Sequence, residues 1–592
     1  MLQHTERLAA LRLKLSEGGV DAFIIPRSDE HLGEYVPPSG ERLAWLSGFT
    51  GSAGLAIVTS DRAILFTDGR YTTQAAAQTD PAFWERRHLV EEPPTDWLRQ
   101  HARGKRVGFD PWLHSEAALG RLAESGAELV PLAPNPLDEI WQDRPPAPTA
   151  PPLAHPLPLA GEASASKRAR LAKLLSEAGE GACLLADAHS VAWLLNLRGG
   201  DLAHTPITLA FALLGADGAV RLFLHAPGRV DEALRVHLGN QVTIEDRAAL
   251  PAALATLSGQ RVRLDPETTP ARLATLLREA GAEVITADDP CRLPRACKNA
   301  AERQGARDAQ AKDAVAVARF LAWFAREAPS GALTEIAAAD ALLAFRREVP
   351  GFACESFPAI SGAGENGAIV HYRATAETDR AIHTNECFLI DSGGQYPEGT
   401  TDITRTLWTG PGPAPEVLRA RYTAVLRGHI ALATLRFPEG VAGPHLDAIA
   451  RRPLWDGGLD YDHGTGHGVG SFLSVHEGPV SISRAARPVP IRPGMILSDE
   501  PGFYLPGHYG IRIENLLLAR EAERQPDQSK TFLDFETLTL APYSRALLDP
   551  TQLTPVELDW VNAYHARVRE AVAPALDAAT RAWLEAETVP LE

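Results

Sequence analysis

Acidic side chains occur at the ends of two β-like segments in the last third of the chain. Asp391 closes an apolar run and is followed by Ser-Gly-Gly, which is typical of a strand that ends in a turn. Asp402 follows eleven positions later in the threonine-rich run 400–405. A hairpin would place the two carboxylates side by side, because neighbouring strands are only about 5 Å apart. Carboxylates that close repel each other unless one is protonated or a cation lies between them, so the pair indicates a cation site.

A glycine-rich segment, 461–470, carries two histidines, His463 and His467. Four of the seven residues 464–470 are glycine, which lets the backbone pass close to a neighbouring group. Glycine also costs conformational entropy on folding, so a run of this kind with two histidines favours a functional explanation. A third histidine, His476, follows shortly after it.

Two further acids complete the pattern. Glu500 follows an apolar strand-like run and precedes a Pro-Gly turn. Glu514 lies in the segment 510–515, where apolar and charged residues alternate. This alternation predicts one strand with Arg512 and Glu514 on the same face.

Together these residues form a ligand set of four carboxylates and one imidazole. A set rich in oxygen favours Mn²⁺, Co²⁺ or Zn²⁺ over Cu⁺ or a thiolate-bound structural zinc. Four negative charges are balanced better by two divalent ions than by one, and two ions about 3.5–4 Å apart can clamp a carbonyl during hydrolysis. The predicted ligands are Asp391, Asp402, His467, Glu500 and Glu514.

Two breaks in the sequence predict three domains. The proline-rich run 144–152 favours an extended, semi-rigid spacer. Asp-Pro and Leu-Pro steps at 289–294 mark the second break. We therefore expect domains at 1–150, 151–295 and 296–592.

In the third domain, helical periodicity at about 298–327 and 334–348 precedes several turn-rich strands. Thr554, followed by proline and by Glu557, predicts a capping box at the start of a closing helix.

The first two domains resemble each other. Three segments recur in the same order about 150–160 residues further on, which predicts a duplicated α/β domain. The alternative is chance similarity in sequence rich in alanine and leucine. The pairs are Ala22–Ile25 with Ala182–Leu185, Ala44–Leu46 with Ala192–Leu194, and Val107–Asp110 with Val262–Asp265.

Composition narrows the class of protein. With 45% hydrophobic and 22% charged residues, the chain is typical of soluble globular proteins. A formal charge of -17 argues against a nucleic-acid partner. The five scattered cysteines favour reduced thiols over a disulfide framework. We identify no signal peptide and no apolar run long enough to span a membrane, and therefore expect a cytoplasmic protein.

In their order and local context, the five predicted ligands resemble those of the pita-bread metallopeptidases, which include methionine aminopeptidase, prolidase and aminopeptidase P. The matching contexts are Asp-Ser-Gly-Gly, His-Gly-Thr-Gly-His-Gly, Glu-Pro-Gly and Ile-Arg-Ile-Glu-Asn. The resemblance to the long, three-domain aminopeptidase P branch covers nearly the whole chain. It includes residues 45–54, 67–71, 192–199, 535–540 and 560–565.

This resemblance implies two creatinase-like α/β domains, a pita-bread catalytic domain and a homodimer. It also implies removal of the first residue from peptides with proline in second position, by a hydroxide that bridges two metal ions. Mn²⁺ is the expected metal, and Co²⁺ and Zn²⁺ remain alternatives.

The resemblance also implies roles for individual residues. Glu500 would be both a ligand and the general base. His371, His463 and His476 match substrate-binding histidines, which would stabilise the oxyanion and protonate the leaving proline nitrogen. Arg512 would hold nearby carboxylates in place.

Two rival functions stay open at this point. A prolidase has the same metal site but cuts only dipeptides, and usually carries one N-terminal domain rather than two. A non-catalytic pita-bread module binds peptides or histones after losing its metal ligands, whereas all five are present here. A creatinase-type enzyme does without the metal set.

Overall fold

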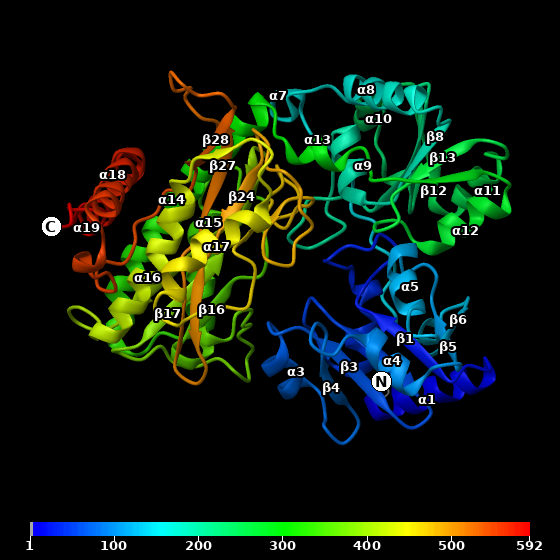
Figure 1. Ribbon diagram of the computed structural model, residues 1–592, viewed down its shortest axis with the longest axis horizontal. Coiled ribbons are helices and arrows are strands. Elements are labelled where there is room, and N and C mark those ends of the chain that lie inside the picture. The colour runs from blue at the N-terminus through cyan, green and yellow to red at the C-terminus, as the bar shows by residue number, and fades with distance from the viewer. Residues whose placement is uncertain (1–3) are drawn as a thin grey trace. The chain divides into compact units, whose positions relative to one another are not determined.

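The computed structural model describes residues 4–592, which form two compact units. The first unit runs to Leu157 and continues over Glu162–Arg292; the second consists of Pro158–Gly161 and Leu293–Glu592 (Figure 1). Within residues 4–592, no helix is both long enough and apolar enough to cross a membrane. All five cysteines lie in this range and are free thiols, as expected.

The first unit contains two six-stranded sheets. One has the strand order β4-β3-β2-β1-β5-β6, and the other has the order β12-β11-β10-β8-β13-β14. The strands of the first sheet are β1 (Ala22–Pro26), β2 (Leu55–Thr59), β3 (Ala63–Thr67), β4 (Glu85–His88), β5 (Arg106–Phe109) and β6 (Glu128–Pro131). Those of the second are β8 (Ala182–Leu185), β10 (Ala210–Gly215), β11 (Val220–Leu224), β12 (Val242–Asp246), β13 (Arg261–Leu264) and β14 (Glu283–Thr286).

The two sheets have the same topology. In each, the first strand pairs antiparallel with the second and parallel with the fifth, and the third pairs parallel with the fourth. The sequence repeats at β1 and β8, and at β5 and β13, occupy equivalent strands. The predicted duplication is therefore confirmed, and chance similarity is excluded.

The same turn leads into the first strand of each copy. Helices α1 (His4–Glu17) and α8 (Ser164–Glu177) precede β1 and β8. Gly19 and Gly179 follow them with φ of 62° and 67°, a left-handed conformation that glycine adopts without a steric penalty. The remaining helices of 5 residues or more in this unit are α2 (Arg42–Ser47), α3 (Thr72–Gln78), α4 (Pro94–His101), α5 (Glu116–Ala123), α6 (Pro136–Ile140), α9 (Ala188–Leu195), α10 (Glu232–Leu238), α11 (Leu250–Ala255) and α12 (Ala271–Glu279).

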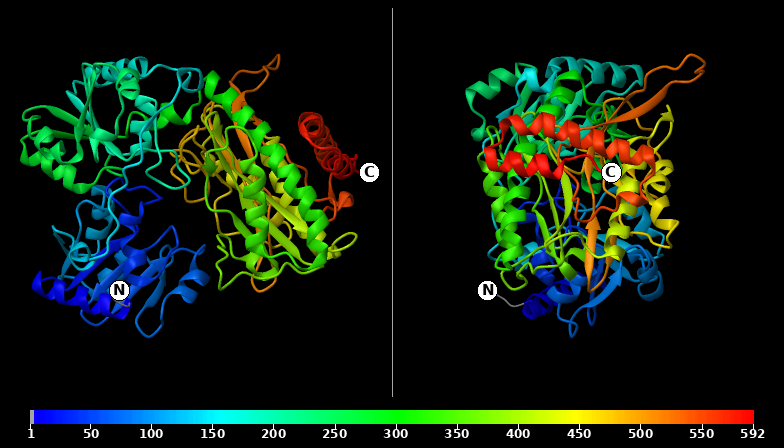
Figure 2. Two further views of the ribbon diagram at one scale, coloured as in Figure 1. Left: turned by 180° about the vertical axis from the view of Figure 1, so that it is seen from behind. Right: turned by 90° about the vertical axis from the view of Figure 1, so that its left-hand side faces the viewer.

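The second unit has two helix pairs that flank its strands (Figure 2, right). Helix α14 (Ala300–Glu327) packs on α15 (Glu335–Arg347), and α16 (Glu416–Ala433) packs on α17 (Gly443–Trp455). The first pair agrees with the two helices predicted from periodicity. The chain closes with α18 (Pro555–Val572) and α19 (Ala578–Glu587), and the Thr554–Glu557 capping box is present as predicted.

Short antiparallel sheets form the centre of this unit. Their orders are β16-β17-β20, β15-β18-β19, β21-β28-β27-β24, β22-β23 and β25-β26. The bounds are β15 (Cys354–Glu355), β16 (Ile360–Ala363), β17 (Cys387–Ser392), β18 (Gly394–Tyr396), β19 (Gly399–Thr400), β20 (Ile403–Trp408), β21 (Phe437–Pro438), β22 (Gly466–His467), β23 (Ser481–Ile482), β24 (Ile496–Asp499), β25 (Gly502–Leu505), β26 (Tyr509–Arg512), β27 (Asn515–Glu521) and β28 (Phe532–Thr537).

The prediction of one strand over 510–515 was wrong. Strand β26 ends at Arg512 and pairs with β25, whereas β27 begins at Asn515 and pairs with β24 and β28. Between them, the Glu514 N–H donates to the carbonyl of Thr404. The backbone changes its hydrogen-bonding partner at Glu514, which an alternating sequence does not reveal.

A buried ion pair joins α14 to α15. Arg346 is 0% exposed, and its Nε and Nη2 donate to the two carboxylate oxygens of Asp313 at 2.8 and 3.0 Å. The hydroxyl of Tyr396 donates to the same carboxylate at 2.9 Å. Removing one partner of such a pair leaves the other charge buried and unbalanced.

We therefore expect Asp313→Ala to lower the free energy of unfolding by about 3–5 kcal/mol, as is typical of a broken buried ion pair. Asp313→Leu combined with Arg346→Met should cost less, because neither charge then remains. The exposed pair Arg452–Asp456 provides the control, since Asp456→Ala should change stability by less than about 1 kcal/mol. Chemical denaturation measures all three. A loss from Asp313→Ala no larger than that of the control would contradict the expectation.

Candidate metal centre

Strand pairing brings Asp391 and Asp402 together. Strands β17 and β20 are antiparallel neighbours, with Asp391 opposite Thr404 and Ser392 opposite Ile403, and Asp402 immediately precedes β20. The predicted hairpin is therefore confirmed, with β18 and β19 forming its connection. Both side chains are buried, and in each the Oδ1 atom accepts no hydrogen bond from any described residue.

His467 faces the same acids from strand β22. Its Nε2 lies 3.5 Å from Asp402 Oδ2 and 3.5 Å from Glu500 Oε1. Its Nδ1 lies 3.0 Å from the carbonyl oxygen of Gly468. Because a carbonyl can only accept, Nδ1 carries the proton, and the lone pair of Nε2 points toward the carboxylates. This is the tautomer that a metal-binding imidazole needs.

The glycine-rich segment allows this close approach. A Cβ on Gly466 would lie 2.0 Å from the carbonyl oxygen of Ser498, and one on Gly468 would lie 2.1 Å from that of Glu477. Neither position has room for a side chain. The expectation that these glycines let the backbone pass close to its neighbours is confirmed.

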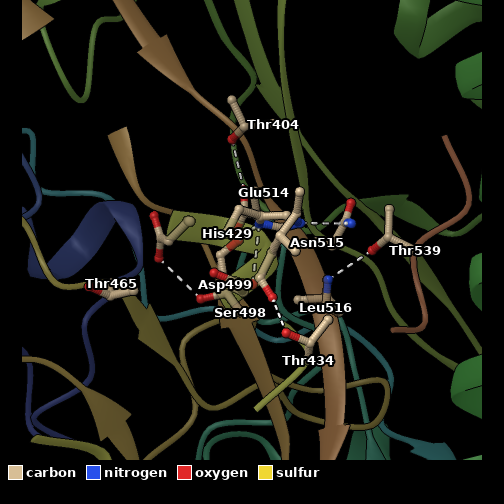
Figure 3. A network of polar contacts seen from close by, with 12 residues as sticks. Thr404, His429, Thr434, Thr465, Ser498, Asp499, Glu514, Asn515, Leu516 and Thr539 are labelled. Carbon is tan, nitrogen blue, oxygen red and sulfur yellow. Dashed lines mark hydrogen bonds and ion pairs between the residues drawn. The ribbon is translucent and has the colours of Figure 1, made fainter. Parts of the chain in front are cut away.

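Glu500 and Glu514 come from the ends of β24 and β27. The hydroxyl of Thr404 donates to Glu514 Oε2 at 2.8 Å, as Figure 3 shows. The hydroxyl of Ser498 donates to Glu500 Oε1 at 3.1 Å. One potential ligand atom from each of Asp402, His467 and Glu514 lies within 4.8 Å of the others.

Arg512 is 1% exposed and contacts the cluster directly. Its Nη2 donates to Asp391 Oδ2 at 2.7 Å, and its Nη1 donates to the hydroxyl of Tyr504 at 2.6 Å. Tyr504 lies 2.8 Å from His463 Nε2, whose ring also contacts the Gly464 carbonyl through Nδ1. A continuous chain of hydrogen bonds thus runs from His463 to Asp391.

The other two predicted histidines occupy different positions. His476 lies edge-on to the His467 ring, with 4.4 Å between centroids. His371 is half-buried in the segment between the short helix Gly364–Ala368 and β17, the strand that carries Asp391.

Burial and neighbouring charges raise the pKa values of Asp402, Glu500 and Glu514. Burial, and then the charges of Asp391 and Glu500, raise the pKa of Asp402 well above its usual range. Burial, and then the charges of Asp402 and Asp391, do the same to the pKa of Glu514. Burial raises the pKa of Glu500 to about 7, while Arg512 opposes the shift.

Divalent ions fit this arrangement. Asp391 and Asp402 each retain an oxygen atom without a hydrogen bond from the described residues, the neighbouring charges disfavour the ionised form of Asp402, and an imidazole lone pair faces the acids. A cation would both satisfy the oxygens and balance the charge.

Four supporting residues were missed by the sequence reasoning. Thr404, Ser498 and Tyr504 belong to segments that had been noted only for their acids, and an isolated hydroxyl carries no signal of its own. His429 lies on α16, far from every motif, and contacts Asp499 of β24 and Asn515 of β27 (Figure 3).

Metal binding at pH 7 should release protons, because carboxylates with raised pKa values hold protons that a cation must displace. With a pKa of about 7, Glu500 is mostly protonated at pH 6 and mostly ionised at pH 8. Mn²⁺ should therefore displace more protons at pH 6 and bind more tightly at pH 8. Calorimetric titration of metal-free protein in buffers of different ionisation enthalpy measures the release. Binding heats that do not depend on the buffer would contradict this expectation.

Comparison with known families divides the chain into four matched regions. Residues 7–140 and 143–302 each match a creatinase/prolidase N-terminal domain. Residues 304–521 match metallopeptidase family M24, and residues 531–591 match the C-terminal region of that family.

Full-length relatives agree with this division. Aminopeptidase P2 of Arabidopsis thaliana is 40% identical, over 99% of this chain and 88% of the relative. The probable Xaa-Pro aminopeptidase P of Neosartorya fischeri is 39% identical, over 99% and 93%. The crystal structure of X-prolyl aminopeptidase from Caenorhabditis elegans, a cytosolic enzyme with a di-nuclear active site, covers 100% of both chains with a TM-score of 0.94 and 33% identity. The chain therefore belongs to the aminopeptidase P family of M24 metallopeptidases, with two creatinase-type N-terminal domains before a pita-bread domain.

Proposed function

We propose that this protein is a metal-dependent Xaa-Pro aminopeptidase, which hydrolyses the peptide bond between an N-terminal residue and a proline in second position. The observation that carries the proposal is the convergence of the buried Asp402 and Glu514 with the half-buried His467, with ligand atoms within 4.8 Å of one another. Similarity to aminopeptidases P over 99% of the chain supports the same substrate class.

The site would hold two divalent ions, as in the di-nuclear C. elegans enzyme. We propose Mn²⁺, with Co²⁺ and Zn²⁺ as alternatives, because the oxygen-rich ligand set suits all three. When bound, the ions polarise the scissile carbonyl and lower the pKa of the attacking water. The proposed ligands are Asp391, Asp402, His467, Glu500 and Glu514.

Glu500 is the proposed general base. Its Oε1 atom lies 3.5 Å from His467 Nε2 and accepts a hydrogen bond from Ser498, so its position is fixed. A carboxylate held in this way can take the proton of the attacking water without moving. Arg512 would keep Asp391 oriented through its 2.7 Å hydrogen bond.

The histidines have to serve an unusual leaving group. The proline nitrogen in the substrate carries no hydrogen, so it needs a proton donor on departure rather than an acceptor. We assign substrate binding, oxyanion stabilisation and this proton transfer to His371, His463 and His476. Tyr504 positions the His463 ring, because its hydroxyl accepts from Arg512 and can donate to His463 Nε2.

The domain boundaries, the assembly and the location of the protein are also part of the proposal. We propose domain boundaries at 1–150, 151–295 and 296–592, which the two equivalent sheets and the unit boundary at Arg292 support. We also propose a cytosolic homodimer that acts on peptides. The cytosolic C. elegans relative supports the location.

Activity on matched peptides tests the substrate class. The Mn²⁺-loaded protein should release arginine from Arg-Pro-Pro, and should cleave Arg-Ala-Ala more than about 200-fold more slowly, a larger ratio than one methylene of pocket fit provides. Mass spectrometry of the products measures both. Cleavage of the dipeptide Arg-Pro alone would instead identify a prolidase. A metal-loaded protein that cleaves none of them would identify a non-catalytic module.

Substitution of single ligands tests the site. Asp402→Asn and Glu514→Gln keep the shape of the side chain but remove a charge. We expect each to lower turnover by more than about 100-fold, beyond the range typical of residues that only support a ligand. Each should also lower the Mn²⁺ content measured by atomic emission. Asp456→Asn, at an exposed acid of the same unit, is the control and should match the wild type. Full activity in either ligand variant would contradict the site assignment.

A further inference from the structure

A single buried imidazole contacts both strands that carry Glu500 and Glu514. His429, on α16, is 0% exposed. Its Nδ1 lies 3.1 Å from the carbonyl oxygen of Asp499 and 3.2 Å from Asp499 Oδ2. Its Nε2 lies 3.1 Å from Asn515 Nδ2 (Figure 3). The helix is thus joined to β24 on one side of the ring and to β27 on the other.

The two residues that His429 contacts are directly opposite each other in the sheet. Asp499 pairs with Asn515 in the antiparallel β24–β27 ladder. Asp499 immediately precedes Glu500, and Asn515 immediately follows Glu514. Glu500 and Glu514 lie just outside this ladder, and the neighbouring side chains have different partners: Glu514 accepts a hydrogen bond from Thr404, whereas Asn515 contacts His429.

Hydrogen-bond chemistry permits one arrangement of this ring. The Asp499 carbonyl beside Nδ1 can only accept a hydrogen bond, so Nδ1 carries the proton. On the other side, Arg405 donates to Asn515 Oδ1 at 2.9 Å, which turns the Asn515 amide nitrogen toward His429. Nε2 must therefore accept. Tyr543, whose hydroxyl lies 3.1 Å from Nε2, also receives a hydrogen bond from Asn515.

We propose that His429 is a positioning residue for the metal centre. It restrains the positions of Glu500 and Glu514 through its contacts with the neighbouring residues Asp499 and Asn515. The inference rests on the proposed metal-dependent function but concerns a residue that touches neither ion nor substrate. Because the ring is fully buried, water cannot replace its hydrogen bonds, and its loss leaves the ends of the paired strands beside Glu500 and Glu514 without this support from α16. Residues that orient metal ligands indirectly typically affect affinity or activity by about 10- to 100-fold.

Three substitutions distinguish the contact at His429 Nδ1 from the contact at Nε2. His429→Leu keeps much of the volume and removes both contacts. His429→Asn retains an N–H donor near Asp499, and His429→Gln retains an acceptor near Asn515. We expect His429→Leu to weaken Mn²⁺ binding by about 10- to 100-fold, and each amide to restore part of the loss. Electron paramagnetic resonance of free Mn²⁺, titrated against metal-free protein, measures the affinity.

His565→Leu is the matched control. His565 is 1% exposed on α18, and its Nε2 accepts from the backbone N–H of Tyr543 at 3.1 Å, so it belongs to the same core. Its loss should lower the free energy of unfolding but leave the Mn²⁺ affinity and the Co²⁺ absorption spectrum unchanged. His429→Leu should change both the Mn²⁺ affinity and the Co²⁺ absorption spectrum. At saturating Mn²⁺ it should lower kcat and leave KM for Arg-Pro-Pro within about twofold.

The outcomes are distinct. Mn²⁺ affinity within about twofold of wild type in His429→Leu would overturn the inference, since indirect ligand support predicts a larger loss. If that variant does not fold, wild-type affinity in both His429→Asn and His429→Gln would overturn it equally. Equal losses of Mn²⁺ affinity in His429→Leu and His565→Leu would reduce the effect to general stability and also overturn it. Mn²⁺ binding by a wild-type protein that hydrolyses no peptide would overturn the proposed function alone.

Discussion

Four carboxylates gather at one site in the second unit, and the repulsion among them has to be offset by the structure that surrounds them. Burial and mutual charge raise the pKa values of Asp402 and Glu514 well above their usual range. Such a cluster opposes folding unless protons or cations neutralise it. The strands that carry it must therefore be held by interactions elsewhere. The buried pair Asp313–Arg346 and the apolar contacts of α16 and α18 provide such interactions away from the acids.

In three of these acids one oxygen is held by a hydrogen bond, and the other oxygen of Asp391 accepts none from the described residues. Asp391 Oδ2 is bound by Arg512, Glu514 Oε2 by Thr404, and Glu500 Oε1 by Ser498. Each donor is itself buried or half-buried and cannot swing away. A carboxylate fixed in this way loses little further entropy on binding a cation, which is the physical content of preorganisation.

The sequence revealed Asp391 and Glu500 because each follows an apolar strand-like run and precedes a turn, and Asp402 and Glu514 through the motifs around them. It also revealed the Thr554 capping box, which depends on neighbouring residues, and the duplication, which depends on repeated segments. It could not reveal Thr404, Tyr504 or His429. Each acts on a residue far away in the chain, as when Thr404 bonds Glu514, and a hydroxyl or an imidazole looks the same whether or not such a partner exists. The break between β26 and β27 was missed for the same reason, since it depends on a backbone partner in β20.

The first unit contains two copies of one sheet, and the two copies contact each other. Ser115 and Pro270 form an antiparallel bridge within the first unit, and they are separated by the same interval as Val107 and Val262 on the equivalent strands β5 and β13. The copies thus meet through equivalent residues, as the subunits of an isologous dimer do. Because they are joined in one chain, their association does not depend on protein concentration.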